Sequence, residues 1–188
     1  MILTIHQPNF MPWYPFFQKM EQADIFVLLG NCQFEKNGFQ NRFQMQGLWN
    51  TLSVKKGTQP IIEKQYSNPQ FEWTKIKKRL FRYKDILDEM DCFISNDLYH
   101  TNQCIIKYFR NQLKIDTPIV PDFATDLKSS ERLLMLCKYY GATTYLAGQG
   151  GKNYLDESLF NKEGIKVIYQ ENLNKKHTLD CLYETVQL

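Results

Sequence analysis

A histidine ends the first apolar run of the chain and is followed by prolines. Residues 2–5 read Ile-Leu-Thr-Ile, then comes His6, and Pro8, Pro12 and Pro15 follow it. Proline fixes φ, so this segment is stiff and holds His6 in a fixed direction. Histidine can exchange a proton with a bound amine or hydroxyl near neutral pH, and ligands of open α/β sheets collect beyond the carboxyl ends of strands. His6 is therefore a candidate catalytic base, although a buried histidine that braces the loop would have the same spacing.

A second polar group follows another apolar run, at residues 23–29. It contains Glu35, Lys36 and Arg42. The Arg guanidinium fits phosphates and carboxylates as a planar fork, so Lys36 and Arg42 are candidates for binding such an anion. An exposed hairpin with ordinary charges would read the same way.

A glycine segment is the third candidate. Gly148, Gly150 and Gly151 follow the apolar residues 145–147. Glycine lets the backbone approach a ligand closely, and the amides at the start of a following helix attract anions. The segment lacks the Gly-Lys-Ser/Thr ending of a P-loop and the GxGxxG dinucleotide pattern, so taken alone it is weak evidence.

Apolar runs bounded by turn residues predict the elements that position these groups. Strands are expected at Ile2–Ile5 and Ala23–Leu29, joined by a helix over Trp13–Gln22. Such a unit favours a parallel sheet covered on both faces, with a right-handed crossover. Asp24, just before the second strand, is expected to be a turn residue.

The middle of the chain has shorter pieces separated by glycine-containing turns. Strands and hairpins are expected at Gln40–Gln46, Thr51–Lys55 and Ile61–Tyr66. Asn68 and Pro69 begin a helical region in which apolar residues recur every three or four positions up to Leu87, and a second amphipathic helix is expected at Leu98–Leu113.

The last third alternates strands and helices. A strand is expected at Thr117–Val120, broken by Pro121, and the helix Ser129–Tyr140 is expected to be capped by a hydroxyl at its start. The remaining strands and helices are expected at Thr143–Ala147, Asn153–Asn161, Ile165–Tyr169 and from Thr178 onward. We therefore predict a single α/β domain over residues 1–188, with a mostly parallel sheet covered by helices and a β-hairpin-rich insertion over about residues 31–66.

Composition narrows the class of protein. Twenty-three Lys and Arg against 20 Asp and Glu give a net charge of +3, too small for the basic footprint of a nucleic-acid binder. We expect no membrane insertion and no signal peptide, because no run reaches the roughly 18 apolar residues of a membrane helix. The five cysteines form no CxxC pair, and Cys32 has no adjacent histidine that would support it as a nucleophile. We predict a cytoplasmic protein without a structural metal, and no cofactor is indicated.

Several blocks, in order along almost the whole chain, resemble the WbqC-like family of bacterial proteins. The first runs from His6 to Trp13 and continues with Phe16 to Lys19. The others are Asp24 with its strand, Gln33-Phe34-Glu35-Lys36, Asn41-Arg42, Asp126-Leu127 with Ser129 to Arg132, Tyr145 to Gly151 with Asn153 to Asp156, and Thr178-Leu179-Asp180. The sequence departs from the family pattern at Gly30, where an acidic residue is common, and at Pro15, where glycine is usual.

The resemblance implies a place in the synthesis of O-antigen and other surface polysaccharides. It suggests a transferase that attaches an acyl or aminoacyl group to the amino group of a nucleotide-activated amino sugar. His6 would be the base, Lys36 and Arg42 would bind the nucleotide phosphates or the donor carboxylate, and Gln7, Asn9 and Asn41 would orient sugar hydroxyls. Further candidate contacts with substrate are Trp13, Lys19, Gln33, Glu35, Ser130, Arg132, Tyr154, Gly148, Gly150 and Gly151. The partners would be a sugar nucleotide and an acyl or amino-acid donor.

Two alternatives stay open. A nucleotidyl or adenylate-forming enzyme also begins with a strand and a histidine-proline loop, but such enzymes carry a second histidine where this chain has Asn9. A non-catalytic module that binds sugar nucleotides would suit the 28 Asn and Gln residues, whose amides donate and accept hydrogen bonds. The sequence leaves the oligomeric state open.

Overall fold

The computed structural model describes residues 1–171 and 173–186, and the chain divides into two compact units. The first unit consists of Met1–Gln7, Pro15–Asn31 and Ile115–Asn174. The second consists of Pro8–Tyr14, Cys32–Lys114 and the chain from Lys175 onward.

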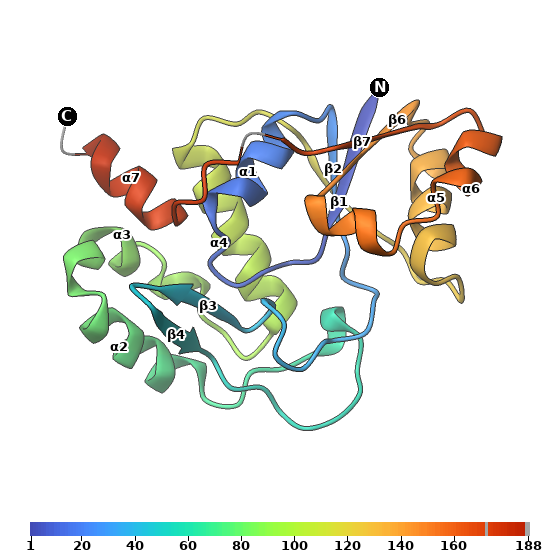
Figure 1. Ribbon diagram of the computed structural model, residues 1–188. Coiled ribbons are helices and arrows are strands. Elements are labelled where there is room, and N and C mark those ends of the chain that lie inside the picture. The colour runs from blue at the N-terminus through green and yellow to red at the C-terminus, as the bar shows by residue number, and fades with distance from the viewer. Residues whose placement is uncertain (172, 187–188) are drawn as a thin grey trace. The chain divides into compact units, whose positions relative to one another are not determined.

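Five parallel strands form the sheet of the first unit, in the order β5-β2-β1-β6-β7 (Figure 1). Each is a short, largely apolar segment, typical of strands buried on both faces. The strands are β1 (Ile2–His6), β2 (Ile25–Leu28), β5 (Ile119–Pro121), β6 (Thr144–Ala147) and β7 (Lys166–Tyr169). The predicted α/β class with a parallel sheet is confirmed.

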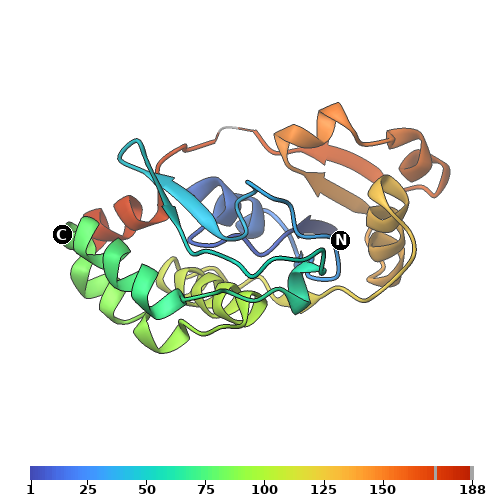
Figure 2. The same ribbon diagram turned by 90° about the horizontal axis from the view of Figure 1, so that it is seen from below.

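Helices cover both faces of this sheet. They are α1 (Tyr14–Glu21), α5 (Ser129–Tyr139) and α6 (Glu157–Lys162). Phe16 of α1 packs on Phe26 of β2, with 5.0 Å between ring centroids. Leu3 and Ile5 of β1 belong to the core cluster that α5 and α6 complete on the other face, because alternate residues of a strand point to opposite sides. Figures 1 and 2 show α5 and α6 beside β6 and β7.

The second unit has an antiparallel hairpin and four helices within the described residues. Its elements are β3 (Arg42–Met45), β4 (Leu48–Thr51), α2 (Pro69–Arg79), α3 (Lys84–Asp88), α4 (Leu98–Gln112) and α7 (Thr178–Val186). Phe10 lies among Phe43, Tyr66 and Trp73, with ring centroids 5.6 to 6.2 Å from its own. The buried Asn102 side chain of α4 donates to the carbonyls of Pro8 and Gln40, at 2.7 Å each, and so fixes the proline-rich segment to the helix.

The insertion contains one hairpin rather than three strand segments. The hairpin turns at Gln46 and Gly47, whose φ values of 53° and 76° fit a type I′ turn. The predicted strands at Thr51–Lys55 and Ile61–Tyr66 are wrong. Thr51 ends β4, the two segments share a single bridge between Val54 and Tyr66, and Ile61–Glu63 is one 3-10 turn.

Three details of the helices and edge strand also differ from expectation. The helix expected to reach Leu87 ends at Arg79, and a 3-10 turn and α3 follow. The helix expected at 153–161 begins only at Glu157, where the Asp156 side chain accepts from the Ser158 amide at 3.1 Å. Pro121 lies within β5, because β5 is an edge strand and an edge tolerates a residue without an amide hydrogen.

The expected hydroxyl cap of α5 is wrong. Lys128 occupies the N-cap position without a side-chain hydrogen bond. The Ser130 hydroxyl instead accepts a hydrogen bond from the Asp156 amide, at 2.9 Å, and so ties the start of α5 to the start of α6.

Candidate active site

The order of the strands reverses between β1 and β6. From β1 the chain runs through α1 to β2 and then to β5 on one side, whereas β6 and β7 lie on the other side of β1. In open parallel sheets a ligand crevice forms at this switch point, outside the carboxyl ends of the strands. The Thr4 hydroxyl donates to the Leu146 carbonyl at 2.7 Å and holds the two strands in register. His6 and Gln7 therefore emerge beside the segment that begins at Gly148.

His6 is the last residue of β1 and is partly buried. Its ring packs edge-on against Phe16, with centroids 4.7 Å apart. Nδ1 lies 3.0 Å from the carbonyl oxygen of Gln7. A carbonyl oxygen can only accept, so Nδ1 carries the proton and Nε2 is the acceptor of the ring.

The environment of His6 keeps the imidazole neutral. Removal from water and, to a smaller extent, the positive charge of Lys19 lower its pKa, the bond to Gln7 raises it, and the net pKa is about 3. The ring is thus a hydrogen-bond acceptor with a fixed orientation at neutral pH.

Lys19 of α1 is buried, with 3% of its surface exposed. Its Nζ donates to the carbonyl of Ile5 at 2.9 Å, one residue before His6. Burial lowers the pKa of the Lys19 amine to about 7, because the charged form loses its hydration. A lysine in this state can take up or release a proton at neutral pH, as a general base or acid requires.

The glycine segment follows β6 at the same edge. Gln149–Asn153 forms a 3-10 turn, and the Gly151 amide donates to the Gly148 carbonyl at 2.9 Å. A Cβ added at Gly148 or Gly150 would meet nothing within 4 Å. At Gly151 it would lie 3.3 Å from the Ala147 Cβ. Close packing thus explains why residue 151 is a glycine. Open space lies beside Gly148 and Gly150, and a ligand has room to approach the backbone there.

Asp122 and Arg132 form a buried ion pair at the ends of β2 and β5. The Arg132 guanidinium lies 2.7 Å from the Asp122 carboxylate, and the two side chains are 9% and 1% exposed. The same carboxylate accepts from the amides of Gly30 and Asn31, at 2.9 and 3.1 Å. Arg132 also donates to the Asn31 carbonyl at 2.9 Å. The pair fixes the loop that leaves β2, so Arg132 positions this edge of the sheet.

Sequence reasoning missed Asp122 and Asn31. A signal was present, because each is a polar residue one to three positions beyond the end of a parallel strand. Their pairing depends on β5 lying next to β2, although some 90 residues separate them in sequence. Asp24, expected to be a turn residue, accepts from the Ile2 amide at 2.6 Å.

The structure assigns the predicted site residues to both units. His6, Gln7, Lys19, Ser130, Arg132, Gly148, Gly150, Gly151 and Tyr154 belong to the first unit, and Asn9, Trp13, Gln33, Glu35, Lys36, Asn41 and Arg42 belong to the second. Within the first unit, His6, Gln7 and the glycine segment follow adjacent strands, and the side chain of Lys19 binds the backbone next to His6.

Several predicted residues of the second unit bind their own loop. The Asn41 side chain is buried and donates to the Leu52 carbonyl at 2.8 Å. The Arg42 guanidinium lies 4.1 Å from the centroid of the Trp49 ring and donates to the carbonyls of Asn37 and Gly38. The Gln33 amide donates to the Gln59 carbonyl at 3.3 Å. Trp13, Glu35 and Lys36 are exposed, and Asn9 is buried.

His177, by contrast, is a buried histidine satisfied within the second unit. Its Nε2 lies 3.2 Å from the Met11 carbonyl, and its Nδ1 accepts from the Leu179 amide at 3.2 Å. Burial lowers its pKa to about 4.

The described part of the chain, residues 1–171 and 173–186, has neither a metal-binding cluster nor a membrane-spanning helix. In that part of the chain no group of three or more His, Cys, Asp or Glu side chains is arranged to hold a metal ion. None of the helices described there has the length and apolarity to cross a membrane.

Comparison with known proteins identifies the family. The chain is 26% identical over 189 residues to the uncharacterized protein Rv1507c of Mycobacterium tuberculosis, covering 89% of this chain and 80% of that protein. A Zn(II)-bound mutant variant of AdcAII from Streptococcus pneumoniae aligns over 99% of this chain and 96% of its own, at 12% identity. Its TM-score of 0.22 is too low to support any inference. The WbqC-like protein family matches residues 7–178, nearly the whole chain, and we conclude that the protein belongs to this family.

Proposed function

We propose that the protein transfers an acyl or aminoacyl group to the amino group of a nucleotide-activated amino sugar, in the synthesis of bacterial surface polysaccharide such as O-antigen. The observation that supports an enzyme is the position of two groups with lowered pKa values, His6 and Lys19, at the strand-order switch between β1 and β6. Groups whose proton affinities are shifted by burial concentrate at functional sites. The substrate class follows from what the family resemblance implies.

The reaction needs a neutral amine and a place for its proton. The sugar nitrogen attacks the acyl carbonyl, a C–N bond forms, and the bond from the carbonyl carbon to the leaving group breaks. The nitrogen loses one proton on the way to the amide. His6 Nε2 accepts a hydrogen bond from the attacking amine and aligns its lone pair, because Nδ1 is held by Gln7.

Lys19 is the better proton acceptor of the pair. An imidazole whose pKa is about 3 binds a proton too weakly to keep it, whereas an amine whose pKa is about 7 matches neutral conditions. We assign His6 the role of holding the attacking amine through Nε2, and neutral Lys19 the role of the base that takes up the proton leaving the sugar nitrogen.

Backbone groups would bind the remaining parts of the substrates. The amides of the segment Gly148–Gly150 suit a diphosphate or the oxyanion of the tetrahedral intermediate, since Gly148 and Gly150 leave room beside the chain. Gln7 would orient a sugar hydroxyl. Lys36 and Arg42 remain the proposed contacts to phosphate or to the donor carboxylate, and Asn9 and Asn41 remain proposed contacts to the sugar.

A transfer assay tests this function. The purified protein is incubated with nucleoside-diphosphate-linked amino sugars and with acyl-coenzyme A or aminoacyl donors, and the sugar nucleotides are followed by mass spectrometry. We expect a mass increase equal to one acyl or aminoacyl group, and none with the matching sugar that carries a hydroxyl in place of the amine.

Variants then separate the roles. His6→Gln and Lys19→Met are each expected to lower kcat/KM by roughly 100-fold or more, as loss of general acid-base catalysis does. His100→Gln, at an exposed histidine of α4, is the control and should keep full activity. Full turnover by His6→Gln and Lys19→Met would exclude the assigned roles. Tight binding of sugar nucleotides without turnover for any donor would instead favour a binding module.

A further inference from the structure

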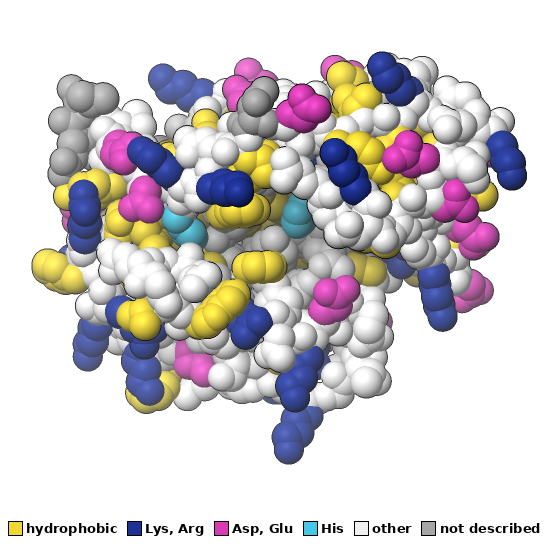
Figure 3. All heavy atoms as spheres, in the orientation of Figure 1, with side chains coloured by type: hydrophobic (Ala, Val, Ile, Leu, Met, Phe, Trp, Pro, Cys, Tyr) yellow, Lys and Arg dark blue, Asp and Glu magenta, His cyan; other side chains and the backbone are white. Residues whose placement is uncertain are grey.

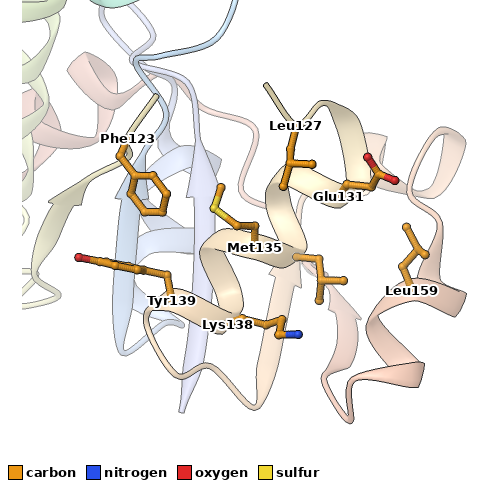
Figure 4. Close-up of a pocket in the computed structure, with 8 residues that line it drawn as sticks. Phe123, Leu127, Glu131, Met135, Lys138, Tyr139 and Leu159 are labelled. Carbon is orange, nitrogen blue, oxygen red and sulfur yellow. The ribbon is translucent and has the colours of Figure 1, made fainter. Parts of the chain in front are cut away.

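The outward face of α5 is apolar at its centre. Its inward residues Leu133, Leu136 and Cys137 belong to the core under the sheet. On the outside, an open depression of about 760 Å³ runs along the helix (Figure 4). It is lined by Phe123, Leu127, Glu131, Leu134, Met135, Lys138, Tyr139 and Leu159. A helix that is apolar on both sides usually has a partner on each.

The charges on this face have a two-fold pattern. Glu131 and Lys138 are both exposed and lie seven residues apart, which places them on one face about 10.5 Å apart along the axis. The midpoint between them falls between Leu134 and Met135. A two-fold axis that passes beside this midpoint, perpendicular to the helix, would place Glu131 of one copy opposite Lys138 of the other, and Leu134 opposite Met135.

We propose that this face pairs with a second copy of the chain, α5 against α5 in antiparallel orientation. Around the axis Leu134 of one copy packs on Met135 of the other. On both sides of this apolar centre, Glu131 of one copy faces Lys138 of the other. An isologous interface requires such self-complementarity, in which a residue of one copy meets the same partner in both directions.

The ends of the depression fit the same arrangement. Leu127 lies before the first turn of α5 and is 39% exposed, and Tyr139 lies in its last turn and is 67% exposed. Antiparallel pairing in this register brings Tyr139 of one copy to the first turn of α5 of the other, at position 130, and so covers the exposed aromatic ring at this end of the face. Lys138 already pairs with Glu163 at 2.6 Å, while both side chains remain about half exposed. It can therefore meet Glu131 of a second copy without leaving Glu163.

Charge reversal tests this pairing with little risk to folding, because Glu131 and Lys138 are exposed. Self-association is measured by sedimentation equilibrium for the wild type, Glu131→Lys, Lys138→Glu and the double variant. We expect a wild-type dimer, on the order of tenfold or more weaker self-association for each single variant, and recovery in the double variant, because each dimer contains the charge pair twice. Lys84→Glu, on α3, is the matched control and should not alter the dimer.

Mixing provides the sharper result. Glu131→Lys presents two positive charges and Lys138→Glu two negative ones, so the mixture should form a heterodimer more strongly than either variant forms a homodimer. Native mass spectrometry with one variant isotopically labelled reads this directly. A wild type that stays monomeric at about 100 µM, a dimer unaffected by both reversals, or a mixture that forms no heterodimer would each overturn the proposal.

Discussion

His6, which is partly buried, and His177, which is buried, show how backbone contacts set the tautomer of a histidine. His6 donates from Nδ1 to the Gln7 carbonyl, whereas His177 donates from Nε2 to the Met11 carbonyl. Both pKa values are lowered by burial, to about 3 and about 4. The same residue type therefore has opposite tautomers in the two units, and only His6 lies at a strand end where a ligand is expected.

This difference predicts an NMR result. Neither His6 nor His177 should change protonation between pH 5.5 and 8, because both pKa values lie below this window. Two-bond ¹H-¹⁵N spectra should show a protonated Nδ1 in His6 and a protonated Nε2 in His177, with assignments made from His6→Gln and His177→Gln. A midpoint for His6 between pH 6 and 7 would contradict this environment.

Lys19 predicts a pH-dependent stability. Its pKa is lowered from 10.5 to about 7 in the folded chain, so between these values the unfolded chain binds more protons and stability rises with pH. The variant Lys19→Met should be more stable than wild type by about 3 kcal/mol at pH 7, after a loss of about 1 kcal/mol for the bond to Ile5.

At pH 10 this advantage should be almost gone, because the energetic cost of keeping Lys19 neutral in the folded chain falls as the pH rises from 7 towards 10.5. Urea unfolding at the two pH values measures the difference, with the exposed Lys84→Met as control. If the stability difference between Lys19→Met and wild type were equal at pH 7 and pH 10, the pKa of Lys19 would not be lowered in the folded chain.

At the scale of the elements, two glycines of the turn after β6 are expected to have different roles, one in packing and one in ligand binding. Gly151→Ala should lower stability by about 1 kcal/mol, because the new Cβ crowds the Ala147 methyl. Gly150→Ala meets open space, so its stability should match wild type while turnover and ligand binding fall. Thermal unfolding and kcat/KM are compared for the two variants. Unchanged turnover in a stable Gly150→Ala protein would remove this segment from the site.

Arg132 of α5 and Asp122, which follows β5, form a buried ion pair, so substitutions of the two residues should have coupled effects on stability. Asp122→Asn leaves the charge of Arg132 buried without a partner, and Arg132→Met does the same to the charge of Asp122. Each substitution should lower the free energy of unfolding by about 3 to 5 kcal/mol. The double variant should lose much less than the sum, because no buried charge remains unpaired. Urea unfolding of the four proteins gives the coupling. Strictly additive losses would mean that the pair does not interact.

The success of sequence reasoning differs between elements. Ile2–His6 and Ile25–Leu28 were predictable, because apolar runs rich in branched and aromatic residues form buried strands. Ile61–Tyr66 was not, because Tyr66 is fixed by the Asn102 side chain of α4, at 2.8 Å, rather than by a strand partner. The hydroxyl at Ser130 suggested a cap, yet it binds the distant Asp156 amide.

The site, too, was predictable only in part, because some of its residues are positioned by contacts between distant parts of the chain. His6 and the glycine segment follow apolar runs, and the rule for strand ends identifies both positions. The burial of Lys19 depends on how α1 crosses β1, and the role of Asp122 depends on the pairing of β5 with β2. Such contacts join residues far apart in sequence, and no local pattern shows them.

For the molecule as a whole, the charge distribution does not have the basic patch that is typical of nucleic-acid binders. The net charge is +3, and Figure 3 shows Lys and Arg side chains scattered over the visible face instead of gathered in one patch. The match to the WbqC-like protein family spans both units, since it runs from residue 7 to residue 178.

A structure with a bound sugar nucleotide tests the central claim most directly, namely that the working site is the edge of the sheet between β1 and β6. With UDP-glucosamine as the probe, we predict its amino group within about 3.2 Å of His6 Nε2 and its diphosphate on the amides of Gly148–Gly150. Density for the sugar nucleotide elsewhere, for example on the outward face of α5, with none at His6, would contradict the account.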